Sequence, residues 1–279
     1  MTIKELINYG KKMLNENEIE DAYTISKVLA QYILNMDRVQ IISNDEKIVD
    51  EDTKNRYYLA LIEIVQGMPI QYITNNQEFM KMNFYVDENV LVPQPDTEIL
   101  VQEVIDIVKK ENKKDILDMC TGSGCIGISV GKNLENVNVT LADISSKALE
   151  IAKINSKNND VKNINYIETN MFENICEKYD IIVSNPPYIE TNEMEKLPKN
   201  VKKEPHIALD GGEDGLDFYK ILVQDSKKHL KRDGYLCMEI GYDQKQRIEE
   251  LIQKDGSYEN IYSKKDLGGN DRIVICKIK

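Results

Sequence analysis

The apolar positions divide the chain into a helical first part and an alternating second part. Apolar residues recur at helical spacing through residues 3–14 and 22–33, and a third helix is expected over about residues 52–66. Beyond residue 115, short apolar runs alternate with helix-spaced segments. The expected strands include DILDM, VNVTLAD, INYIET, YDIIVSN and GYLCMEI. Such alternation predicts an α/β fold, with a mostly parallel sheet covered by helices on both faces.

An extended region separates the two parts. The Asp-Glu-Asn break in FMKMNFYVDENVLV suggests a hairpin, and two prolines stiffen the chain before a helix expected at residues 97–109. The sequence therefore predicts a helical domain over residues 1–75, a hairpin linker over 76–92 and an α/β domain over 93–279. Since the helical domain carries no motif of chemistry, we expect it to recognise the substrate.

Charge and composition indicate which classes of partner and site the protein is expected to lack. The net charge of -12 disfavours a nucleic-acid substrate, because duplex binders usually carry a basic surface. No apolar run approaches the roughly 18 residues of a membrane span, and the N-terminus lacks a signal-peptide pattern, so a cytoplasmic protein without membrane contact is expected. Five cysteines without CxxC spacing and two distant histidines indicate neither a disulfide framework nor a metal site.

A glycine-rich turn, DMCTGSGCIG, follows the first strand of the second part. Its glycines satisfy GxGxxG, which alone is a weak signal shared with dinucleotide-binding enzymes. Asp118 stands at the strand end, where a carboxylate would repel a pyrophosphate and attract the ammonium of S-adenosylmethionine. Asp143 ends the next strand, as expected for an acceptor of ribose hydroxyls; the alternative is an acid at a helix N-terminus.

A second motif, Asn185-Pro186-Pro187-Tyr188, ends the strand YDIIVSN. A planar amide or exocyclic amine is a poor nucleophile with two N–H donors, so its site must offer acceptors. The Asn185 side-chain oxygen and the Pro186 carbonyl provide two, and Tyr188 can pack on the flat group. Catalysis would consist mainly of orientation. The alternative is a proline turn that only ends the strand.

These two motifs resemble those of class I methyltransferases that modify amide or amino nitrogens. Five further segments resemble, in order, the HemK/PrmC family, the protein-(glutamine-N5) methyltransferases of peptide chain release factors. They are GMPIQYI (67–73), VLVPQPDTEIL (90–100), EPHIALDGGEDGLDFY (204–219), EIGYDQ (239–244) and DLGGNDR (266–272).

The resemblance implies a Rossmann-like domain with a seven-stranded sheet and a small N-terminal helical domain. It implies S-adenosylmethionine as cofactor and, as acceptor, the glutamine in the Gly-Gly-Gln loop of class I release factors. Cofactor contacts are carried onto Cys120, Thr121, Gly122, Ser123, Gly124, Asp143, Met171 and Asn185. The resemblance also implies that the acceptor glutamine is held by Asn185, Pro186, Pro187 and Tyr188.

Three positions depart from the commoner family pattern. Gln94 replaces an arginine, Cys120 replaces a glycine and Asn170 replaces an aspartate. The first removes a possible ion pair, and the other two bear on the geometry of the adenine pocket. Two other functions share these features. An adenine-N6 nucleic-acid methyltransferase could use the same NPPY chemistry, but the acidic charge weighs against it. A noncatalytic binding module could keep the fold, but the intact Asn185 argues against that.

Overall fold

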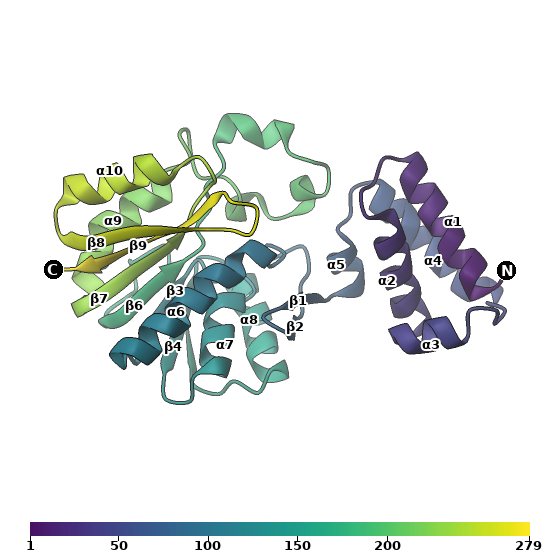
Figure 1. The fold of residues 1–279 in the computed structure, drawn as a ribbon, viewed down its shortest axis with the longest axis horizontal. Helices are drawn as coiled ribbons and strands as arrows, with labels where there is room; N and C mark the ends of the chain where they lie inside the picture. Colours follow the sequence, from purple (N-terminus) through teal and green to yellow (C-terminus); the bar gives the residue numbers. More distant parts are fainter. The chain divides into compact units, whose positions relative to one another are not determined.

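The computed structural model describes all 279 residues, and they form two compact units (Figure 1). The first unit comprises Met1–Asn75 together with Pro198–Lys203, and the second comprises Asn76–Leu197 and Glu204–Lys279. Gly67 shows how the distant segment joins the first unit. A Cβ on Gly67 would lie 3.0 Å from the carbonyl oxygen of Lys199, so the two backbones are in close contact.

The first unit is a bundle of helices around its own apolar core. Tyr57 is fully buried in this core, and its hydroxyl lies 2.7 Å from the Ser26 Oγ. Thr2 and Asp37 start two of the helices with capping boxes, in which side chain and backbone satisfy each other's donors. The helices are α1 (Ile3–Glu16), α2 (Ala22–Leu34), α3 (Arg38–Ser43), α4 (Glu51–Val65) and α5 (Ile70–Thr74). The sequence pattern indicates α1, α2 and α4, but α3 and α5 are too short to show a helical period.

The expected hairpin forms, but its turn lies earlier than the sequence suggests. Strands β1 (Gln77–Phe79) and β2 (Met82–Phe84) pair antiparallel, and Phe79 opposes Met82. The turn is therefore made by Met80 and Lys81, both of which have positive φ. The prediction that the Asp-Glu-Asn break forms the hairpin turn was wrong. Tight hairpin turns usually contain Asn or Gly, and the sequence Met80-Lys81 contains neither, so it gave no turn signal.

The second unit contains one seven-stranded sheet with the order β5-β4-β3-β6-β7-β9-β8. The pairs that involve β9 are antiparallel, and the others are parallel. This confirms the predicted mostly parallel sheet. The strands are β3 (Asp115–Met119), β4 (Asn138–Asp143), β5 (Ile164–Glu168), β6 (Tyr179–Ser184), β7 (Leu230–Glu239), β8 (Tyr258–Lys265) and β9 (Asp271–Ile278).

Two apolar cores cover the two faces of this sheet, because successive side chains of a strand point to opposite faces. In β3, Ile116 packs in one core, whereas Leu117 and Met119 pack in the other. The first core includes α6 (Glu98–Glu111), α7 (Cys125–Asn133) and α8 (Ser146–Asn158), and the second includes α9 (Asp217–His229) and α10 (Lys245–Asp255) (Figure 1).

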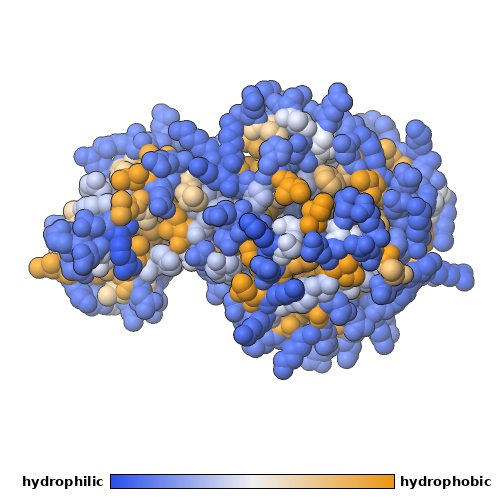
Figure 2. Space-filling view, turned by 180° about the vertical axis from the view of Figure 1, so that it is seen from behind, coloured by the Kyte–Doolittle hydropathy of each residue, from blue (hydrophilic) through white to orange (hydrophobic).

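Short 3₁₀ helices complete the second unit. They are η1 (Pro95–Thr97), which leads into α6, and η2 (Thr191–Lys196) and η4 (His206–Ala208); η3 (Val201–Lys203) belongs to the first unit. On the face shown in Figure 2, hydrophilic residues predominate, and hydrophobic residues gather in patches on each unit. No helix of the chain combines the length and the apolar character needed to cross a membrane.

Candidate active site

A cavity lies at the carboxyl ends of the central strands, where ligands bind on open α/β sheets. Its volume is about 800 Å³, open solvent at the mouth included. Most of its lining is apolar, and Asp143 is its single charged residue. The lining residues are Asn89, Val90, Leu91, Met119, Cys120, Gly122, Asp143, Ile144, Ser145, Ala148, Thr169, Asn170, Met171, Asn185, Pro187, Pro205, Ile207, Ala208 and Phe218.

Asp118 supports the glycine-rich turn from beneath and does not line the cavity. Its carboxylate is fully buried, and its Oδ2 accepts hydrogen bonds from the Thr121 hydroxyl at 2.6 Å and from the Gly127 backbone N–H at 2.9 Å. Its Oδ1 is buried without a hydrogen-bond partner. Burial raises the pKa of Asp118 to about 7, although these two donors act in the opposite direction. One oxygen therefore holds the shape of the turn while the other remains an unsatisfied acceptor.

The start of α7 requires a glycine at position 127 for a steric reason. A Cβ there would lie 2.3 Å from the Leu141 Cδ2 and 2.9 Å from the Val139 Cγ1, both on β4. The helix can thus approach the sheet closely, which brings its first turn to the edge where β3 and β4 end. Thr121, Ser123 and Gly124 shape this turn but do not line the cavity, whereas Gly122 does.

Cys120 adopts a backbone conformation that favours glycine. Its φ is +61°, in the left-handed region, and the φ of Met171 is +48°. The Cys120 thiol lies 3.9 Å from the Met171 sulfur, and both residues line the cavity. The chain therefore accommodates a side chain at position 120 with local backbone strain.

Asp143 joins the turn to the next helix while it faces the cavity. Its Oδ2 accepts from the Gly122 N–H at 2.8 Å, and its Oδ1 accepts from the Ser145 N–H at 2.9 Å. Burial raises the pKa of its carboxyl, and the two backbone donors lower it. A carboxylate offers about four lone-pair sites, so two remain for a ligand.

The NPPY motif forms a turn directly after β6. The Ser184 hydroxyl donates to the Met119 carbonyl at 2.7 Å, which ties the end of β6 to the end of β3. Asn185 and Pro187 line the cavity, whereas Pro186 is buried and Tyr188 is half-buried, and neither lines it. The Asn185 Nδ2 lies 3.4 Å from the Thr97 Oγ1.

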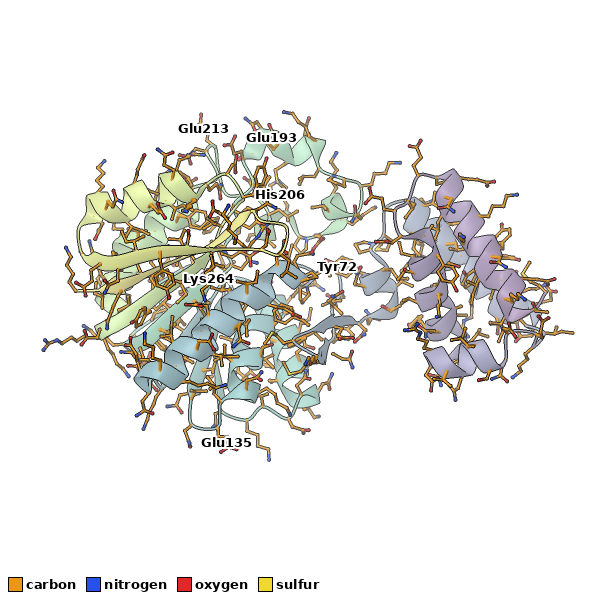
Figure 3. The ribbon with its side chains drawn as sticks, in the orientation of Figure 1. Tyr72, Glu135, Glu193, His206, Glu213 and Lys264 are labelled. Atoms are coloured by element: carbon orange, nitrogen blue, oxygen red, sulfur yellow. The ribbon has the colours of Figure 1, made fainter.

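The segment around residues 205–211 supports the same turn. The Ile189 N–H donates to the Leu209 carbonyl at 2.9 Å, and the Gly211 N–H donates to the Ile189 carbonyl at 2.8 Å. A Cβ on Gly211 would lie 2.7 Å from the Tyr188 Cα, so only glycine allows this approach. Figure 3 labels His206, which belongs to this segment.

Charged side chains lie behind the turn. Arg272 on β9 donates to Asp266 at 2.9 Å and forms an ion pair with Asp96 at 3.3 Å. Burial raises the pKa of Tyr188 to about 12, and Arg272 acts in the opposite direction. The Gln244 amide donates to the Tyr188 carbonyl at 2.9 Å. The segments EIGYDQ and DLGGNDR thus contribute to the support of the NPPY turn.

The structure brings five of the expected cofactor residues to one cavity: Cys120, Gly122, Asp143, Met171 and Asn185. Asn170 also lines it, and its amide donates to the Glu173 carboxylate at 2.9 Å. Gln94 donates to the Val92 carbonyl at 2.9 Å. Sequence reasoning did not identify the walls at residues 89–91 and 205–208. The only sequence feature that could have indicated these walls is that they belong to, or adjoin, the family-like segments at residues 90–100 and 204–219.

Two family models and full-length relatives match this chain. The model of the PrmC N-terminal domain matches residues 5–74, and that of the methyltransferase small domain matches residues 94–213. The release factor glutamine methyltransferase of Clostridium acetobutylicum is 39% identical over 99% of this chain and 98% of its own length. That of Clostridium botulinum is 37% identical over 98% of both chains.

Solved structures share the fold at lower identity. The hMettl16 catalytic domain in complex with the MAT2A 3'UTR hairpin 6 aligns with a TM-score of 0.60 at 17% identity, over 75% of this chain and 80% of that chain. A methyltransferase from Pyrococcus furiosus aligns with a TM-score of 0.52 at 18% identity, over 70% and 88%. Identities this low show the fold alone. The full-length relatives and the two family models show more, and the chain belongs to the PrmC/HemK family of release factor glutamine methyltransferases.

Proposed function

We propose that this protein transfers a methyl group from S-adenosylmethionine to the side-chain amide nitrogen of the glutamine in the Gly-Gly-Gln loop of class I peptide chain release factors. The observation that carries the proposal is that Asn185, in its NPPY turn, lines the same cavity as Asp143 and Cys120. One cavity therefore has a cofactor side and an acceptor side.

The residues present suit S-adenosylmethionine better than a dinucleotide. The lining contains no lysine or arginine, and its single charge is the Asp143 carboxylate, which a pyrophosphate would avoid. Asp143 keeps lone pairs for ribose hydroxyls. Asp118, Thr121, Ser123 and Gly124 hold the turn, and the unsatisfied Oδ1 of Asp118 leaves negative potential beneath it. Cys120, Gly122 and Met171 line the wall. When bound, S-adenosylmethionine would supply an electrophilic methyl group.

The acceptor side offers the polarity that an amide nitrogen needs. Asn185 lines the cavity, and its side-chain oxygen is assigned to one N–H group of the acceptor. The Pro186 carbonyl, which lies outside the cavity lining, is assigned to the other N–H group, and the prolines provide no competing backbone donors. Pro187 closes the wall, and Tyr188 supports the turn through its carbonyl bond to Gln244. Rate enhancement comes from holding the acceptor lone pair toward the methyl group, because the site contains no evident general base.

The partner is expected to be a protein. The net charge of -12 is unfavourable for a phosphate backbone. A loop with two glycines can enter a narrow cavity without Cβ clashes. We assign substrate recognition to the helical unit, because a short loop alone buries few anchoring side chains.

Asn185→Ala tests the acceptor side separately from cofactor binding. The variant should fold and bind S-adenosylmethionine, measured by calorimetry, yet lose at least about 100-fold in turnover at saturating cofactor. Glu135→Ala, on an exposed turn, is the control for the purification and assay. Turnover of Asn185→Ala within twofold of the parent would refute the proposed role.

A further inference from the structure

A buried carboxylate lies next to the acceptor motif in the sheet. Ser184, the last residue of β6, opposes Met238 of the parallel strand β7. The next residues along the two strands are Asn185 and Glu239, so they occupy neighbouring positions at the carboxyl edge of the sheet. Glu239 is only 2% exposed, and Thr97, the last residue of η1 and the N-cap of α6, is also 2% exposed. Neither residue lines the cavity.

Three polar residues, Asn185, Thr97 and Glu239, lie next to one another at the carboxyl edge of the sheet. The Asn185 Nδ2 lies 3.4 Å from the Thr97 hydroxyl oxygen. Burial raises the pKa of the Glu239 carboxyl, and hydrogen bonding by Thr97 and Asn185 lowers it. The Oε2 of Glu239 is buried without a hydrogen-bond partner. A buried carboxylate with an incomplete set of hydrogen bonds destabilises the fold. Its presence here therefore calls for a functional explanation.

We propose that Glu239, together with Thr97, is a positioning residue that fixes the orientation of the Asn185 amide, so that its oxygen and not its NH₂ group faces the acceptor. This inference rests on the proposed function of the NPPY turn. An ionised carboxylate only accepts hydrogen bonds. It therefore attracts the NH₂ group of Asn185 and leaves the amide oxygen for the cavity.

The opposite orientation would block the reaction. A flipped Asn185 presents N–H donors to an acceptor group that itself carries two N–H donors, so the two would repel. Nothing in the shape of an asparagine prevents this flip, because its oxygen and nitrogen ends are nearly equal in size. Selection between the two orientations must come from the groups behind Asn185, and Glu239 is the acidic one among them.

The charge of Glu239 makes the orientation sensitive to pH. Burial raises its pKa to about 7; Thr97, Arg272 and Asn185 lower it, and Asp96 raises it. The other titratable groups that face Glu239 are Cys125, Tyr188 and Tyr219, whose pKa values burial raises, so they stay neutral in this range. A protonated Glu239 can donate to the Asn185 oxygen and hold the flipped amide. Turnover should therefore fall as the pH drops through the pKa of Glu239.

The test compares the full-length parent with Glu239→Gln at saturating S-adenosylmethionine and release factor, from pH 6 to pH 8.5. The parent should lose turnover below about pH 7. Glu239→Gln should bind the cofactor within twofold of the parent and lose at least about tenfold in turnover at pH 8. Its acidic limb should be smaller than that of the parent, and any limb that remains is assigned to Asp118, whose pKa is also about 7. Parental turnover with a parental pH profile in Glu239→Gln would overturn the proposal. Methylation by the parent keeps the proposed function separate from this outcome.

A second set of variants decides the question if Glu239→Gln fails to fold. Thr97→Ser keeps the hydroxyl and should retain turnover, whereas Thr97→Val should lose it without loss of cofactor affinity. Asn185→Asp should be inactive, because two carboxylates then face each other. Asn185→Asp combined with Glu239→Gln exchanges donor and acceptor and should recover at least about tenfold over Asn185→Asp. Equal turnover in both Thr97 variants, together with no recovery in the double variant, would overturn the proposal.

Discussion

Asp143 both holds the glycine-rich turn and faces the cavity, and its position in the sequence indicates only the second of these roles. A carboxylate at a strand end predicts a ligand contact, and the structure places it on the cavity wall. Its hydrogen bonds to the Gly122 and Ser145 N–H groups are visible only in three dimensions. The same side chain thus holds the glycine-rich turn and offers its remaining lone pairs to the cavity.

Replacing Asp143 should weaken cofactor binding. Asp143→Ala removes the charge-assisted acceptors and should reduce affinity for S-adenosylmethionine by roughly 1.5–3 kcal/mol. Calorimetric titration measures this directly, with Glu135→Ala as a control that removes a carboxylate from an exposed turn. If Asp143→Ala binds as tightly as the parent, Asp143 does not contact the cofactor.

Cys120 should carry measurable backbone strain. Its φ of +61° costs an L-residue with a Cβ roughly 1–2 kcal/mol relative to glycine. Cys120→Gly should therefore be more stable than Cys120→Ala by about 1 kcal/mol in urea unfolding, since both variants lose the thiol and differ in the Cβ. Equal unfolding free energies in the two variants would show that the turn is unstrained.

The elements of the second unit were predicted more completely than their contacts. The strands β3, β4 and β6 coincide with apolar runs, because a strand covered on both faces is apolar along most of its length. The edge strand β5 is only partly buried. The hairpin turn at Met80 and Lys81 gave no Asn or Gly signal. The juxtaposition of Asn185 with Glu239 depends on the register of β6 against β7, which local sequence does not encode.

The packing of α7 on β4 should be sensitive to a single methyl group. Gly127→Ala would place a Cβ 2.3 Å from the Leu141 Cδ2, and overpacking of this kind costs about 1–3 kcal/mol. Ser129→Ala is the control in the same helix, because its buried hydroxyl has no hydrogen-bond partner and its loss should be nearly neutral. Thermal unfolding of both variants measures the difference. Unchanged stability of Gly127→Ala would show that the helix can move away from the sheet at no cost.

The two units have separate apolar cores, which suggests a division of labour. The core of the first unit contains no residue of the second, and every residue that lines the cavity belongs to the second unit. A fragment of residues 76–279 should therefore bind S-adenosylmethionine within about threefold of the full chain. It should lose at least about tenfold in kcat/KM for the release factor, because the helical unit is assigned to recognition. Parental efficiency of the fragment would contradict that assignment.

The identity of the methylated atom tests the central claim most directly. The full-length protein is incubated with S-adenosylmethionine, a class I release factor and adenine-containing DNA and RNA, and the products are sequenced by tandem mass spectrometry. We predict one added methyl group on the side-chain amide of the glutamine in the Gly-Gly-Gln loop, and none in a release factor in which that glutamine is alanine. Methylated adenine together with an unmodified release factor would contradict the account.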